Sequence, residues 1–239
     1  MTFLKICWIK RIENVSKIKQ DPKITECSRC GTCCKKGGPC FHLEDKILIE
    51  KGIILSKYLY TIREGELFYD NIKECILPAV SDIIKIKGQK ESWTCIFFNE
   101  KENECTVYDN RPLECRALKC WDTREIEKIY FKNRLTRKDL LSNVEGLWDL
   151  VENHQKRCSY EKLNIFIDIL KKDKKNEALK DILDIIEYDA KIRELVVQKG
   201  GLDPEMTDFI FGRPITETIR IYGFNIKKQD DTYRLIPIS

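Results

Sequence analysis

Apolar side chains recur at helical spacing through the second half of the chain. Between residues 140 and 151 they fall at i, i+1, i+4, i+7, i+8 and i+11, which share one helix face: Leu140, Leu141, Val144, Leu147, Trp148 and Val151. The spacing recurs over residues 163–170 and 179–196, where Gly200 marks the helix end, and a further helix is predicted after Pro204. We therefore predict a helical region whose apolar stripes form a core or a partner-facing surface.

The end of the chain predicts a small β-hairpin. Phe224 and Ile226 alternate with polar residues, and Tyr233 and Leu235 do the same beyond a polar turn. Pro237 should end the second strand, because proline has no N–H to donate to a ladder.

The first half has shorter and less regular apolar runs. Residues 43–52 predict a short helix that ends at Gly52, and residues 83–86, 95–98 and 106–108 predict short strands. Long loops separate these pieces, as suits a fold organised by metal ligation. The predicted fold class is mainly α with short strands.

The predicted domain organisation follows the same division. Residues 1–125 are expected to form an irregular, cysteine-rich metal-binding domain. Residues 126–239 are expected to form a helical domain that ends in the β-hairpin.

The composition of the chain excludes some classes of function. The chain has 239 residues, twelve Cys, only two His and a net charge of +4, with acids interleaved among the bases. This charge pattern argues against a nucleic-acid binder, and a chain of this length does not need disulfides to compensate for a small core. Residues 1–10 contain no long apolar signal region, and no apolar run approaches 18 residues. We expect a cytoplasmic protein without a membrane span, whose thiols stay available to metal.

A cysteine triplet is the strongest chemical signal. Cys27, Cys30 and Cys33 form Cys-x-x-Cys-x-x-Cys, and Cys34 follows directly. The same spacing opens the ligand run of bacterial ferredoxins, whereas structural zinc usually takes one Cys-x-x-Cys pair from each of two places. Thiolates without imidazole favour zinc, cuprous copper or iron–sulfur. Nine thiols could supply one or two centres: Cys27, Cys30, Cys33, Cys34, Cys40, Cys95, Cys105, Cys115 and Cys120.

The motifs over residues 27–34 (CSRCGTCC), 95–98 (CIFF) and 105–116 (CTVYDNRPLECR) together resemble the YkgJ-like CxxCxxCC cysteine-cluster family. That family is described as a zinc- or iron-chelating domain and is often labelled an iron–sulfur protein. The resemblance covers about residues 24 to 122. It implies seven metal ligands: Cys27, Cys30, Cys33, Cys34, Cys95, Cys105 and Cys115. Cys40 and Cys120 lie outside the shared pattern and are further candidates.

Two arginines flank Cys115 and are candidate cofactor-binding residues. Arg111 and Arg116 could donate charge-assisted hydrogen bonds to cluster sulfur and raise its reduction potential. An alternative for Arg111 is an ion pair with Glu114 or Asp109. Four other residues have simpler interpretations: His42 is expected at the surface or in packing, and Cys7, Cys75 and Cys158 as small apolar residues.

The leading functional hypothesis is an iron–sulfur protein with one or two clusters, of the 4Fe–4S type, that performs redox or cluster-assisted chemistry. Such a protein would bind a redox partner or another protein partner. One alternative is an enzyme that modifies a protein side chain, because some relatives with this cysteine pattern resemble flagellin lysine N-methyltransferases. Another is a structural zinc module whose helical half binds a partner. The sequence contains no Walker loop or Gly-x-Gly-x-x-Gly motif, and it assigns no catalytic residue.

Overall fold

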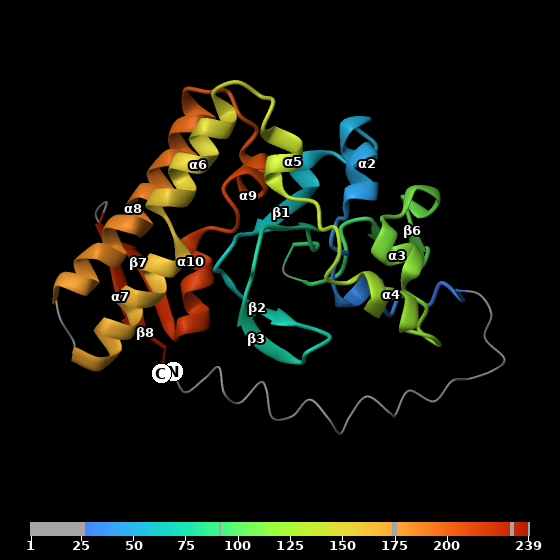
Figure 1. The fold of residues 1–239 in the computed structure, drawn as a ribbon, viewed down its shortest axis with the longest axis horizontal. Helices are drawn as coiled ribbons and strands as arrows, with labels where there is room; N and C mark the ends of the chain where they lie inside the picture. Colours follow the sequence, from blue (N-terminus) through green and yellow to red (C-terminus); the bar gives the residue numbers. More distant parts are fainter. Residues whose placement is uncertain (1–26, 91, 174–175, 230–231, 239) are drawn as a thin grey trace. The chain divides into compact units, whose positions relative to one another are not determined.

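A computed structural model describes residues 27–90, 92–173, 176–229 and 232–238 (Figure 1). The prediction about residues 1–10 lies outside this part of the chain. The chain forms two compact units, each built from several segments. The first, here the cysteine unit, comprises Met1–Leu59, Phe68–Leu77 and Ile83–Leu135, and the second, here the helical unit, comprises Tyr60–Leu67, Pro78–Asp82 and Thr136–Ser239. The domain boundary predicted near residue 125 stays a prediction.

The chain up to residue 135 folds into short elements, most of which belong to the cysteine unit. They are the 3₁₀ turns η1 (Cys34–Lys36), η2 (Leu43–Asp45), η3 (Ser56–Tyr58) and η4 (Tyr108–Asn110), the helices α2 (Lys46–Glu50), α3 (Leu113–Ala117) and α4 (Arg124–Ile129), and the strands β1 (Leu59–Ile62), β2 (Leu67–Asp70), β3 (Cys75–Pro78), β4 (Ile83–Ile86), β5 (Phe98–Asn99) and β6 (Glu104–Cys105). Strands β2 and β3 pair with each other, as do β5 and β6.

The core of the cysteine unit is built around Phe41. Its side chain is fully buried, its N–H donates to the carbonyl oxygen of Ile84 (2.9 Å), and its own carbonyl accepts from the N–H of Leu135 (3.0 Å). Ile84 and Leu135 are also fully buried. Apolar burial therefore anchors a framework from which the cysteine loops project.

The sequence predicted some of these elements and misplaced others. The helix ended by Gly52 and the strand over residues 83–86 are confirmed. The strand expected at 95–98 is present only as Phe98–Asn99, and the strand expected at 106–108 is wrong because the chain turns there into η4. The hairpin of β2 and β3 was not predicted. Cys75 in β3, expected as a small apolar residue, is disulfide-bonded.

The helical unit contains the longest helices of the chain. Its elements are α5 (Arg137–Leu141), α6 (Leu147–Arg157), α7 (Tyr160–Asp173), α8 (Asn176–Gln198), η5 (Pro204–Met206), α9 (Thr207–Ile210), α10 (Ile215–Thr218), η6 (Ile219–Tyr222), β7 (Phe224–Gln229) and β8 (Thr232–Pro237). Figure 1 shows α7 and α8 side by side, with the β7–β8 hairpin against them.

The apolar stripes of α7 and α8 form a core, as one of the two interpretations predicted. Leu163 and Ile167 of α7 pack with Ile182 and Ile186 of α8, and all four are essentially inaccessible to solvent. Burying a side chain of this kind contributes about 1.5–3 kcal/mol. The predicted combination of helices, short strands and a C-terminal hairpin is confirmed in outline.

Two details of the helical prediction differ from the structure. The single helix expected over 140–151 is divided into α5 and α6, because Gly146 adopts a left-handed conformation (φ 73°) before Leu147. The helix expected after Pro204 is a series of short turns that includes α9 and α10. The hairpin is confirmed, since Ile226 faces Leu235 and β8 ends at Pro237. No helix among the described residues has both the length and the apolar character that a membrane span requires.

Candidate metal centre

The first cysteine motif forms a tight loop at the surface of the cysteine unit. Arg29 and Gly31 both adopt left-handed backbone conformations (φ 55° and 73°), so the chain reverses direction between the cysteines. Gly31 lies against the ring of Phe98, and a Cβ added to it would come within 2.3 Å of the Phe98 Cζ atom. Glycine is therefore required by both conformation and space, and Phe98 fixes the position of the loop.

Backbone pairing brings two more cysteines to this loop. The N–H of Cys95 donates to the carbonyl oxygen of Cys34 (2.8 Å). Cys105 is opposite Phe98 in the β5–β6 ladder, the same Phe98 that contacts Gly31. The short β5–β6 hairpin thus positions the sulfurs of Cys95 and Cys105 next to the first motif.

Helix α3 supplies Cys115 to the same region. The N–H of Leu113, at the start of this helix, donates to Oδ1 of the buried Asp45 (2.8 Å). A carboxylate at a helix N-terminus satisfies an otherwise unpaired N–H. This cap fixes the start of α3 two residues before Cys115.

Five thiols are close enough to influence one another electrostatically: Cys33, Cys34, Cys95, Cys105 and Cys115. Burial raises the pKa of Cys95 to about 11 and also raises those of Cys105 and Cys115. Neighbouring sulfurs add to each of these increases. Crowded, buried thiols of this kind are unfavourable as anions unless a cation lies among them. The donor set therefore fits a thiolate-bound metal.

One member of the group is already predisposed to ionise. The thiol of Cys34 donates a hydrogen bond to the sulfur of Cys33, which lowers the pKa of Cys33 to about 6 and raises that of Cys34. The positive charge of Arg111 lowers the pKa of Cys33 further. Cys27, Cys30 and Cys33 are exposed, so this edge of the cysteine group faces solvent.

Comparison with known families gives the same interpretation of these cysteines. Residues 26–134 match the model of the CxxCxxCC family, whose description is "Putative zinc- or iron-chelating domain". The resemblance to this family is confirmed. All nine candidate cysteines lie within the matched residues 26–134, and the family description covers zinc and iron alike. Comparison with curated proteins and with solved structures gave no match.

The two candidate arginines, Arg111 and Arg116, have different environments. The guanidinium of Arg111 stacks 3.7 Å from the centre of the Tyr108 ring, and its Nε donates to the Tyr108 carbonyl oxygen (2.8 Å). Its charge nevertheless reaches the sulfurs of Cys33 and Cys105. Arg116 is more than half exposed and lies 3.9 Å from Oδ1 of Asp45. Of the two, Arg111 is the one that the structure places near the sulfurs.

Cys40 and Cys120 also have surroundings of their own. Cys40 is buried, and its sulfur accepts a hydrogen bond from Nζ of Lys85 (3.5 Å). The charges that act on Cys40 come from Lys85, Glu114 and Arg134. Cys120 is exposed beyond the end of α3. Neither sulfur is among those that influence the five grouped thiols.

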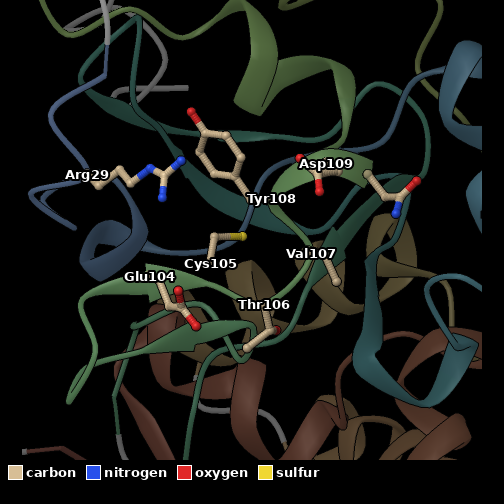
Figure 2. A pocket seen from close by; sticks show the side chains of 8 residues that line it. Arg29, Glu104, Cys105, Thr106, Val107, Tyr108 and Asp109 are labelled. Atoms are coloured by element: carbon tan, nitrogen blue, oxygen red, sulfur yellow. The ribbon is translucent and has the colours of Figure 1, made fainter.

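An open hollow of about 280 Å³ borders Cys105 (Figure 2). The side chains of Arg29 and Tyr108 lie beside it, and the Arg29 guanidinium is 4.6 Å from the centre of the Tyr108 ring. Figure 2 shows the Cys105 side chain below those of Arg29 and Tyr108. A small molecule in this hollow would lie next to a candidate metal ligand.

Cysteine spacing does not reveal the polar network that lies behind the cysteines. His42, expected at the surface or in packing, is buried; its Nδ1 is 2.8 Å from the carbonyl oxygen of Lys132 and its Nε2 is 3.5 Å from Oε1 of Glu114. The other oxygen of Glu114 accepts from the N–H of Cys40 (2.6 Å). Glu114 thus joins α3 to the segment that follows the first motif. Its position directly before Cys115 was the available signal.

Proposed function

We propose that the cysteine unit binds an iron–sulfur cluster and that the protein exchanges electrons through it in the cytosol. The observation that supports this most strongly is the number of grouped thiols. Five sulfurs influence one another, and Cys27 and Cys30 belong to the same loop as Cys33. A single zinc ion takes four ligands, so this set exceeds what one zinc requires and suits a polynuclear centre.

The proposed ligands are drawn from the seven cysteines of the family motifs: Cys27, Cys30, Cys33, Cys34, Cys95, Cys105 and Cys115. Cys40 and Cys120 are left out because both lie outside the shared family pattern; Lys85 also donates to the sulfur of Cys40. Arg111 would act as a nearby positive charge that favours the reduced, more negative state of the centre.

The exposure of the first motif supports a role in electron exchange. Cys27, Cys30 and Cys33 are all exposed, so a cluster held by this loop would lie close to the surface. When bound, the cluster would supply one-electron chemistry. The loop would then be the side that a redox partner approaches.

Metal and sulfide analysis of anaerobically purified full-length protein tests the proposal. We expect iron and acid-labile sulfide in equal amounts, about four of each per cluster, and a paramagnetic resonance signal on reduction. Cys115→Ser should lose most of this iron, whereas Cys120→Ser should retain it. Colourless protein with stoichiometric zinc and no sulfide would overturn the proposal in favour of a structural zinc module.

A further inference from the structure

A second group of metal-binding side chains lies in the helical unit. The ligand atoms of His154, Cys158 and Asp189 all lie within 4.8 Å of one another. His154 belongs to α6 and Cys158 follows the end of that helix, four residues later, so both project from one helix face. Asp189 comes from α8. Each side chain is at most 1% exposed.

The imidazole of His154 is held in an orientation that suits a ligand. Its Nε2 is 2.7 Å from Oδ1 of Asp189, whereas its Nδ1 is buried and has no hydrogen-bond partner among the described residues. An ion bound between Nε2 and this carboxylate would take the place of their hydrogen bond, and the neutral ring would then carry its proton on Nδ1.

The other two donors also have capacity left. The Cys158 thiol makes only a long contact with the carbonyl oxygen of Ile185 (3.8 Å). Oδ1 of Asp189 accepts from Nε of Arg193 (3.1 Å) as well as from His154, while Oδ2 accepts from the N–H of Ile215 (3.0 Å). Once an ion replaces the hydrogen bond from His154, Oδ1 keeps its bond from Arg193 and has a lone pair for the ion.

We propose that His154, Cys158 and Asp189 form a second, mononuclear metal site for a divalent ion of the zinc class. One nitrogen, one sulfur and one oxygen donor form a mixed set of the kind that zinc accepts, and three protein ligands leave a fourth position open. A tetrahedral zinc ion holds such donors about 3.3–3.6 Å apart, given bond lengths of about 2.0–2.3 Å. The most widely separated of the donors, up to 4.8 Å apart, thus need to approach by no more than about 1.5 Å.

Charge balance is compatible with a divalent ion. Cys158 is held as a neutral thiol by burial, which raises its pKa to about 12, so binding would release one proton. The resulting thiolate and the Asp189 carboxylate together neutralise two positive charges. The guanidinium groups of Arg193 and Arg63 act on the same residues and oppose a cation.

The scarcity of histidine allows a direct test. The chain has only two His, so tag-free, full-length protein labelled with ¹⁵N at histidine gives four ring-nitrogen signals. We would load it with ¹¹³Cd²⁺, a spectroscopic substitute for zinc. A ¹¹³Cd–¹⁵N coupling on one ring nitrogen of His154 is the expected result, with assignment by His42→Gln. The all-cysteine centre proposed for the other unit cannot give this signal.

The amount of metal bound per chain in variants provides an independent test of the site. Cys158→Ala should lose one equivalent of bound divalent metal per chain and also the coupling, while Cys30→Ser should keep the coupling. Absence of any coupling on His154 in folded, cadmium-loaded wild-type protein would overturn the proposal. His154, Cys158 and Asp189 would then only join α6 to α8. Either result leaves the iron and sulfide analysis of the cysteine unit unaffected.

Discussion

The guanidinium of Arg63 lies 4.5 Å from the centre of the Tyr160 ring, and both side chains are buried in the helical unit. Nη1 of Arg63 donates to the carbonyl oxygen of Cys158 (3.0 Å), but Nε and Nη2 have no hydrogen-bond partner among the described residues. The ring face of Tyr160 is therefore an important compensation for a buried cation.

Substitutions of Tyr160 should separate its two contributions. Tyr160→Phe keeps the ring and removes the hydroxyl, with its hydrogen bond to Oγ1 of Thr218 (2.8 Å), and should reduce the free energy of unfolding by about 1 kcal/mol. Tyr160→Leu also removes the ring beneath Arg63 and should cost at least about 3 kcal/mol. Urea unfolding followed by circular dichroism measures both. Equal losses in the two variants would contradict the role given to the ring.

His154 should make the metal-free helical unit sensitive to acid. Burial lowers the pKa of His154 to about 4, so the unfolded chain binds its proton first, near pH 6.5. Stability should therefore fall as the pH decreases from about 6.5 to 4, by up to about 3 kcal/mol. The pKa of Asp189 is lowered to about 2 despite burial, chiefly by the hydrogen bond from His154, which adds a further loss below about pH 4.

Comparison with His154→Gln isolates this effect. His42 has a raised pKa because of its hydrogen bonds to Glu114 and Lys132, despite opposing burial, so its contribution changes with pH in the opposite direction. The urea midpoint of chelator-treated wild type should fall more between pH 6.5 and 4 than that of the variant. Parallel profiles for the two proteins would show that His154 is not buried in its neutral form.

The sequence predicted the elements whose determinants are local. The stripes of α7 and α8 and the alternation in the C-terminal hairpin each lie within a short segment, and those predictions are confirmed. The division between α5 and α6 depends on the conformation of Gly146, which the apolar spacing does not record. Periodicity specifies which residues share a face, but not where the backbone is interrupted.

Prediction of the candidate sites from the sequence is limited in the same way. Cysteine spacing identified the first candidate motif because its cysteines are close together in sequence. The pairing of His154 with Asp189 joins residues 35 positions apart, so only the fold brings them together. The four-residue spacing of His154 and Cys158 was visible, but a single His–Cys pair on a helix has many structural explanations without a third donor.

Gly31 should be essential for assembly of the metal centre. Gly31→Ala would place a Cβ 2.3 Å from the Phe98 ring and at a φ of 73°, so the first motif should shift and the iron content fall several-fold. Gly146→Ala is the matched control, because Gly146 has the same φ and its Cβ would meet nothing within 4 Å. Metal analysis of both variants tests this prediction. Equal metal loss would mean that general destabilisation of the protein, and not displacement of the first motif by contact with Phe98, limits assembly.

In metal-free protein, Cys33 should be the most reactive thiol near neutral pH. With a pKa of about 6, roughly 90% of it is thiolate at pH 7. Cys34→Ala should move its alkylation profile to higher pH because the main hydrogen bond to the Cys33 sulfur is lost, and Arg111→Gln should do so to a smaller extent. Arg116→Gln should leave the profile unchanged, since that side chain lies beside Asp45. Rate measurements with peptide mapping test this order, and an unshifted profile in Cys34→Ala would show that the hydrogen bond does not control Cys33.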